Sequence, residues 1–202
     1  MFLSDMNNDV KFEEEHESDH LNCKKFMSVI PKKLVEKEAR LFQRFNKSKL
    51  NSLKKIQQLY DFMDEIYGYS DPITPCGKGC NYCCYYDITA SELEVLHIEK
   101  TQTVKRSANV SPPLFGEQPS FSGKSCSFLI NGICSIYSSR PFVCRKHIAM
   151  TNTSKWCDVK NESDRGFTTV RFSEIEKSYE HIVMQSKLST QYDIRKWFPL
   201  KS

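Results

Sequence analysis

Apolar residues recur near helical spacing over residues 32–68. Most are three, four, seven or eight positions apart, the period of one helix face: Leu34, Leu41, Phe42, Phe45, Leu53, Ile56, Tyr60, Met63 and Tyr67. Pro31 stands where the first turn of a helix begins, and Gly68 ends the pattern. The polar stretch from Asn46 to Asn51 predicts a break that makes two helices.

Two later segments also predict helices, each from a capping box. Thr89 and Glu92 open a helix that ends near residue 100. Ser173 and Glu176 open another that ends near residue 187. The apolar stripe of this last helix consists of Ile175, Tyr179, Ile182 and Val183.

Turn residues separate these helices. Residues 101–125 are rich in Ser, Thr, Pro and Gly and predict a long loop. Asn131 and Gly132 lie between short apolar runs and predict a tight hairpin turn. Trp197 and Phe198 near the end of the chain are expected to pack back onto the core.

Charge is unevenly distributed along the chain, although the net charge is only +4. Residues 1–19 carry seven acidic side chains against the single Lys11 and few aliphatic residues, so we expect residues 1–30 to form a disordered acidic tail. Residues 32–55 carry nine Lys or Arg against two Glu. Such a stretch can attract nucleic acid, but a solvated helix face is its commoner origin, so nucleic acid is not an expected partner.

The composition is that of an ordinary globular protein. A chain of 202 residues with 39% hydrophobic and 27% charged residues suits one domain, with or without a helical extension. No apolar run approaches the length of a membrane span. The acidic N-terminus lacks the apolar region of a secretion signal. We therefore expect a cytoplasmic protein without a membrane partner.

Cysteine is the residue type that points to chemistry. The chain has nine cysteines, and eight of them lie between Cys76 and Cys157, whereas Cys23 stands apart as an expected free thiol. The odd count and the reducing cytosol disfavour a disulfide framework. A bridge between the neighbours Cys83 and Cys84 would also be strained. Metal binding is therefore favoured over disulfides and inert thiols.

The spacing defines two groups of candidate metal ligands. The first reads Cys76-x3-Cys80-x2-Cys83-Cys84, and the second reads Cys126-x7-Cys134-x9-Cys144-x12-Cys157. Glycines 77 and 79 let the first group wrap tightly around one centre. The eight sulfurs suffice for one four-Cys site with spare thiols or for two sites, and the spacing leaves both open.

The kind of metal follows from the density of the first group. Zinc sites usually show two separated pairs of ligands. Closely spaced cysteines are typical of iron–sulfur ligation, so a [4Fe–4S] cluster is the favoured cofactor and zinc the alternative. Because such a group binds only the folded chain, metal binding is expected to contribute to the free energy of folding.

The second group has a recognisable setting. It includes the run Cys126-Ser-Phe-Leu-Ile-Asn-Gly-Ile-Cys134-Ser-Ile-Tyr-Ser-Ser-Arg140-Pro141-Phe-Val-Cys144-Arg145, and Cys157 is followed by Asp. Together with the first group it resembles the YkgJ-like cysteine-cluster family, described as zinc- or iron-chelating. Flagellin lysine methylases look similar in the same motif, where a [4Fe–4S] cluster is thought to bind. The resemblance implies a metal-binding accessory, structural or redox module, or alternatively an S-adenosylmethionine-dependent protein lysine methyltransferase.

Three further residues are candidates near the metal. Arg140 and Arg145 are our candidate cofactor-binding residues, because their positive charge could lower the electrostatic cost of an anionic cluster. Alternatively, each could form an ion pair with a surface acid such as Asp87. His147 could ligate through imidazole, but thiolates are already in excess.

The expected architecture is mainly α-helical, with an irregular metal-nucleated Cys-rich lobe and little sheet. It comprises the tail of residues 1–30, a helical arm over residues 31–70 and a cysteine-cluster domain over residues 71–202 with a C-terminal helix. The first three cysteines also match radical S-adenosylmethionine spacing, but too little chain follows for that barrel. Enzymatic activity, catalytic residues and a protein partner are left open.

Overall fold

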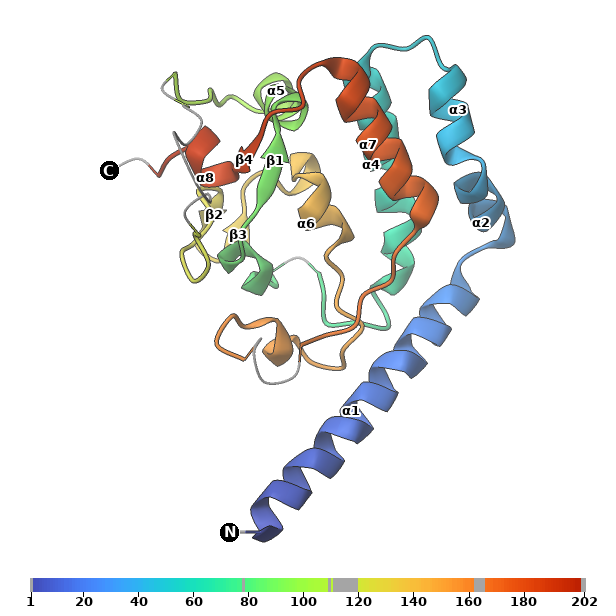
Figure 1. The fold of residues 1–202 in the computed structure, drawn as a ribbon, viewed down its shortest axis with the longest axis vertical. Coiled ribbons are helices and arrows are strands. Elements are labelled where there is room, and N and C mark those ends of the chain that lie inside the picture. Colours follow the sequence, from blue (N-terminus) through green and yellow to red (C-terminus); the bar gives the residue numbers. More distant parts are fainter. Residues whose placement is uncertain (1, 78, 109, 111–119, 162–165, 201–202) are drawn as a thin grey trace.

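The computed structural model describes residues 2–77, 79–108, 110, 120–161 and 166–200, with side chains from residue 16 onward. Within these ranges the protein is mainly α-helical, and its strands form small two-stranded sheets, which confirms the expected fold class. Figure 1 shows a body of packed helices and loops from which one long helix projects. No helix in the described ranges is long and apolar enough to cross a membrane.

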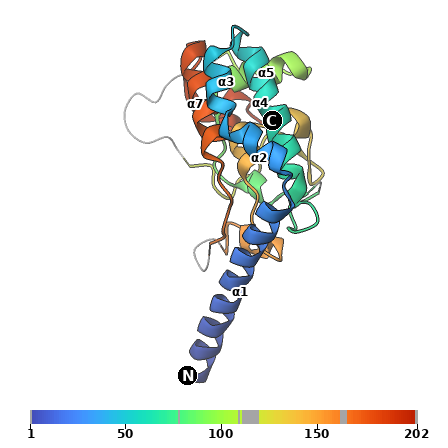
Figure 2. The same cartoon turned by 90° about the vertical axis from the view of Figure 1, so that its right-hand side faces the viewer.

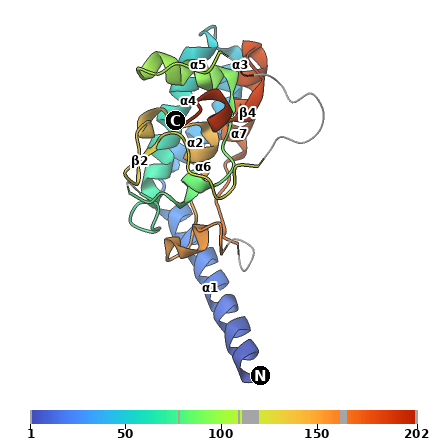
Figure 3. The ribbon, with the colours of Figure 1, turned by 90° about the vertical axis from the view of Figure 1, so that its left-hand side faces the viewer.

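The projecting helix is α1 (Phe2–Val29), and it replaces the disordered tail expected for residues 1–30. Figure 3 shows its N-terminal half leading away from the body. Its C-terminal half is docked, because Asp19, Asn22 and Phe26 are buried at helical spacing. Asn22 donates a hydrogen bond of 3.0 Å to the carbonyl of Met150, far along the chain. Because only a few residues on one face of α1 are buried, the sequence shows little of the apolar periodicity that predicts a helix.

The predicted run of residues 32–68 forms three helices, α2 (Lys32–Ala39), α3 (Leu41–Lys47) and α4 (Ser52–Tyr67). The expected break is confirmed: Asn51 caps α4 by accepting the backbone N–H of Lys54 at 2.9 Å. Gly68 ends α4, also as expected. A further break at Arg40 was not predicted. Pro31 is the residue just before α2 rather than its first residue.

Helix α7 (Ser173–Ser186) packs along α3 and α4, and Figure 2 shows this layer of helices from the side. The predicted apolar stripe faces the layer: Ile175, Ile182 and Val183 are buried, and Tyr179 is partly buried. This helical core is built from α1, α4, α7 and their neighbours. It forms without any cysteine of the second group.

Both predicted capping boxes are misplaced. Helix α5 (Glu92–Thr101) is capped by Ser91 with Glu94, because Thr89 belongs to β1 (Thr89–Ser91), which pairs antiparallel with β4 (Gln191–Asp193). Helix α7 has no side-chain cap at Ser173. Glu176 instead binds Arg171 and Lys146, so an ion pair outweighs the local cap there.

A second core surrounds the Cys-rich segment. The hairpin of β2 (Leu129–Ile130) and β3 (Ile133–Cys134) turns at Asn131 and Gly132, both with positive φ, as predicted. Trp197 and Phe198 are buried here, which confirms that the end of the chain packs back. The remaining helices of the described part are short: η1 (Gly68–Ser70), which packs on α1 and α4, η2 (Tyr82–Tyr85), η3 (Tyr137–Ser139), α6 (Phe142–Lys146), which packs on α4, η4 (Ser154–Cys157) and α8 (Ile194–Trp197).

The loop expected over residues 101–125 agrees with the structure where it is described. Helix α5 ends at Thr101, and in the described part no helix or strand lies between it and β2, which begins at Leu129. Residue 109 and residues 111–119 lie outside the described ranges.

Candidate metal centre

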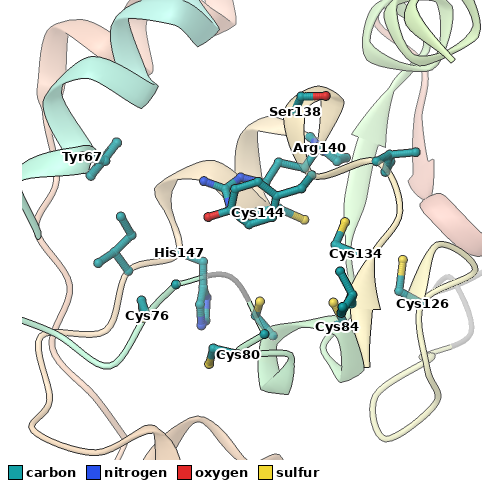
Figure 4. Close-up of a pocket in the computed structure, with 18 of the residues that line it drawn as sticks. Tyr67, Cys76, Cys80, Cys84, Cys126, Cys134, Ser138, Arg140, Cys144 and His147 are labelled. Atoms are coloured by element: carbon teal, nitrogen blue, oxygen red, sulfur yellow. The ribbon is translucent and has the colours of Figure 1, made fainter. Parts of the chain in front are cut away.

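The cysteines of both predicted groups line one cavity of about 640 Å³. Its wall includes Cys76, Cys80, Cys83, Cys84, Cys126, Cys134, Cys144 and Cys157. Figure 4 shows several of these side chains around the cavity together with Arg140 and His147. All nine cysteines are free thiols, and Cys23, on α1, is not part of the wall. The fold therefore gathers the whole predicted ligand set and leaves out the predicted free thiol.

The first cysteine group is held by tight backbone turns. The amide of Cys80 donates to the carbonyl of Gly77 at 3.1 Å, and that of Cys84 donates to Asn81 at 2.9 Å. Gly79 has a φ of +99°, a conformation that suits glycine. The short helix η2 then carries Cys83 and Cys84 to the cavity. The wrapping expected from the glycines is thus present.

The second group is tied directly to the first. The amide of Cys126 donates to the carbonyl of Cys84 at 2.8 Å. Asn81 donates from its side chain to the carbonyl of Gly132 at 3.2 Å. These bonds hold the β2–β3 hairpin, which carries Cys134, against the first group.

Helix α6 brings Cys144 to the cavity, and a buried carboxylate fixes where that helix begins. Glu94 accepts the backbone N–H of Phe142, the first residue of α6, at 2.7 Å. Sequence reasoning did not single out Glu94. The pattern Ser91-x-x-Glu94 could have identified this residue, because it matches a capping box just as Thr89-x-x-Glu92 does.

Burial makes most of these thiols hard to ionise. It raises the pKa of Cys76 to about 11, that of Cys126 to about 11 and that of Cys157 to about 12. Burial also raises the pKa of Cys144 well above its usual value. A bound cation would remove this penalty, because it stabilises the thiolate form.

Cys83 differs from its neighbours. A hydrogen bond from the Cys84 thiol, with a smaller effect from the Arg140 guanidinium, lowers the pKa of Cys83 to about 7. The same contact raises the pKa of Cys84. Cys83 is therefore the thiol that ionises most readily in the absence of metal.

Arg140 and His147 leave polar atoms unsatisfied on the cavity wall. Arg140 Nε and His147 Nε2 are buried and have no hydrogen-bond partner among the described residues. The guanidinium of Arg140 lies 3.9 Å from the ring centroid of Tyr137. Burial lowers the pKa of His147 to about 4, so its imidazole is neutral near pH 7. These atoms and the thiols fit a metal-containing anionic group, because they offer soft ligands, a cation and a neutral imidazole.

Arg145 is not on the cavity wall. Its side chain is 1% exposed and forms an ion pair with Asp64, not with Asp87. It also donates to the carbonyls of Arg140 and Ser138, with its guanidinium 4.2 Å from the ring centroid of Tyr60. The expectation that Arg145 neutralises the metal group is therefore replaced by a structural role, whereas Arg140 keeps a place at the cavity.

Asp87, the acid first considered for these arginines, faces Arg195 at 3.9 Å. It also accepts hydrogen bonds from Ser120 and Phe121. The sequence could not show this, because Arg195 lies more than a hundred residues away from Asp87 along the chain.

The cavity, its thiols and its tight turns define a cysteine cluster, whose side chains have the chemistry of soft metal ligands. Residues 75–164, which include all eight cysteines of the wall, match the family model CxxCxxCC, described as a "Putative zinc- or iron-chelating domain". The match confirms the resemblance to this cysteine-cluster family over that part of the chain. No curated protein and no solved structure matches the chain.

Proposed function

We propose that this protein binds iron in [4Fe–4S] form through the cavity cysteines and acts as an accessory, structural or redox module. The observation that carries the proposal is the convergence of eight free thiols on one cavity of about 640 Å³. The family match supports metal binding of the zinc or iron kind. The choice of a cluster over zinc rests on spacing, the first of the two arguments that follow, whereas the second supports a four-thiolate metal centre in general.

The first argument concerns spacing. Four thiolates around one zinc ion lie about 3.8 Å apart, since each Zn–S bond is about 2.3 Å in a tetrahedral site. Within the described ranges, no group of three or more Cys, His, Asp or Glu side chains is arranged to hold a single ion. Thiols spread around a larger cavity suit a cluster, because its iron and sulfide atoms occupy the space between the ligands.

The second argument concerns charge, and it supports an anionic four-thiolate centre of either kind, because four thiolates around zinc are also anionic. Arg140, whose Nε atom is buried, lies on the cavity wall and supplies a compensating positive charge. An iron–sulfur cluster would supply one-electron redox chemistry or a structural cross-link, according to its exposure and surroundings. The chain's own part is to exclude water, hold the thiols and provide positive charge.

The setting of this function is also proposed. Nine free cysteines suit a reducing compartment, and we place the protein in the cytoplasm. A protein partner would be needed for an accessory role. The methyltransferase alternative rests on the resemblance alone, because no feature of the described residues adds to it.

The test is purification without oxygen, followed by an ultraviolet–visible spectrum and analysis of iron, sulfide and zinc. A broad band near 400 nm with at least about four irons and four sulfides per chain is expected for a [4Fe–4S] protein. The matched control is Cys23→Ala, which changes a cysteine outside the cavity and should leave the spectrum unchanged. A colourless protein that holds only zinc, or no metal, would contradict the cluster.

A further inference from the structure

We propose that the eight cavity cysteines form two separate four-thiolate centres, one of Cys76, Cys80, Cys83 and Cys157 and the other of Cys84, Cys126, Cys134 and Cys144. The first is called the loop set and the second the hairpin set. The inference rests on the proposed function and adds which thiols share a centre. Neither the spacing of the cysteines nor the family match assigns this partition.

Packing unites the hairpin set. Its four cysteines belong to or pack against the same hydrophobic cluster, which also holds Phe128 and Trp197. The hydrogen bond between the Cys126 amide and the Cys84 carbonyl joins the two segments that supply the set. Electrostatic coupling agrees, because Cys84 and Cys144 each interact with both Cys126 and Cys134. These four thiols thus surround one part of the cavity.

The loop set lies against the other core. Cys76 packs against the helical core rather than the hairpin cluster. Cys157 comes from η4, which packs on η2, and its thiol interacts electrostatically with Cys76, Cys80 and Cys83. Figure 4 shows Cys76 and Cys80 toward one side of the cavity and Cys84, Cys126 and Cys134 toward the other, with Cys144 between the two groups and above them in this view.

The adjacent pair Cys83 and Cys84 marks the border between the two sets. Both residues lie on the 3₁₀ helix η2, where successive side chains diverge by about 120° because the helix has three residues per turn. Neighbours that diverge in this way can serve two centres more easily than one. Cys83 interacts electrostatically with Cys134 and Cys144 of the hairpin set as well as with Cys76, Cys80 and Cys157 of the loop set, which places it at the border.

Arg140 makes the two centres unequal. Its charge acts on Cys83, Cys134 and Cys144, two of which belong to the hairpin set. A positive charge favours the more anionic, reduced form of a cluster, so the hairpin centre should reduce first.

The test uses four variants of the full chain, each prepared without oxygen and reconstituted with iron and sulfide. Cys76→Ala and Cys157→Ala are single variants that each remove one ligand of the loop set. Cys126→Ala and Cys134→Ala each remove one ligand of the hairpin set. Two centres predict about eight irons in the parent chain and about half in each single variant. A double variant with both changes in one set should also keep about half of the iron. A double variant with one change in each set should lose nearly all of the iron.

A second measurement guards against misfolding. Electron paramagnetic resonance of the reduced parent chain should show two interacting centres, and each single variant should retain one simple signal from the intact set. Circular dichroism should show that α-helix content is kept in the Cys126, Cys134 and Cys157 variants, because these residues lie outside the helical core. Cys157→Ala therefore tests the loop set even if Cys76→Ala, whose residue touches that core, misfolds.

The alternatives give different patterns. A parent chain with about four irons, in which some variants lose everything and others lose nothing, would overturn the partition and leave the proposed function intact. The partition would also be overturned if a double variant with one change in each set lost only half of its iron. A parent chain that takes up no iron would instead refute the proposed function itself.

Discussion

The carboxylate of Glu94 accepts the backbone N–H of Phe142 at 2.7 Å, which fixes helix α6 against helix α5. The same carboxylate accepts the hydroxyls of Tyr60 at 2.8 Å and Tyr179 at 2.6 Å, and both the amide and the hydroxyl of Ser91. Glu94 is 1% exposed. One buried acceptor thus connects the helical core to the helix that carries Cys144.

Replacing Glu94 by Gln should destabilise the protein by about 2–4 kcal/mol. The amide NH₂ would face donors such as the Phe142 amide and the Tyr60 hydroxyl, which bond to Glu94. An unsatisfied buried donor costs about 1–3 kcal/mol, more when a charged acceptor is lost. Chemical unfolding in urea measures the change. Glu65→Gln is the matched control, because Glu65 makes only an exposed ion pair with Lys37 and should change stability by less than about 0.5 kcal/mol. Equal effects of the two variants would contradict this role of Glu94.

Arg145→Leu should cost about 2–4 kcal/mol of unfolding free energy, because it leaves the carbonyls of Ser138 and Arg140 without their buried donor. Asp64→Asn should cost less than about 1 kcal/mol, since the Asp64 side chain is half exposed. Thermal or urea unfolding of both variants tests the asymmetry. The iron bound per folded Arg145→Leu chain should stay at the parent value. A selective loss of iron would show that Arg145 serves the centre after all.

Arg140→Gln should make the reduction potential of one centre more negative. Reduction adds negative charge, and the guanidinium that stabilises this charge would be absent. Potentiometric titration followed by electron paramagnetic resonance measures the shift. Lys146→Gln removes a charge that is not on the cavity wall and should leave the potentials unchanged. Unchanged potentials in Arg140→Gln would refute the electrostatic role of Arg140.

Metal uptake by the apo chain should release protons and weaken as the pH falls. The pKa values of Cys76, Cys126 and Cys157 are raised to about 11 or 12, so these thiols are protonated near pH 7 and must lose protons to ligate. With Zn²⁺ as a probe, the logarithm of the binding constant should rise with pH by about three to four per pH unit for a four-thiol site. Cys83 should release less than one proton on metal binding, because its pKa is about 7 and part of it is already ionised near that pH. Competition with a chelator between pH 6.5 and 8.5 measures the slope, and a flat profile would argue against thiol ligation.

Removing the metal should loosen the Cys-rich half more than the helical half. The first cysteine group and the hairpin contain few long elements, whereas α4 and α7 share a continuous apolar core. Amide hydrogen exchange with and without a chelator, without oxygen, should show lost protection over residues 120–161 and retained protection in α4 and α7. A melting transition that the chelator leaves unchanged would show that the metal adds nothing to folding.

The sequence located the elements that neighbouring residues control. The Asn131–Gly132 turn was predictable because both residues tolerate positive φ, and the break before Ser52 because Asn51 is a good cap. The eight cavity cysteines were predictable as a set because so many thiols in this spacing have few other uses.

The sequence also misled where a local signal competed with a distant one. Thr89 and Glu92 fit a capping box as well as Ser91 and Glu94 do, and the pairing of β1 with β4 decided between them. The acidic start of the chain lacks an apolar pattern, yet α1 is helical and its later half is docked through Asn22 and Phe26.

What the sequence determined by itself is therefore the chemistry of the ligands and the local turns that present them. Only the tertiary structure decided that Arg140 lines the cavity while Arg145 pairs with Asp64. It also brought Cys157 to the first cysteine group and Cys126 to Cys84. The physical reason is that spacing along the chain controls only near neighbours, whereas the contacts that group thiols and pair charges join residues up to about a hundred positions apart.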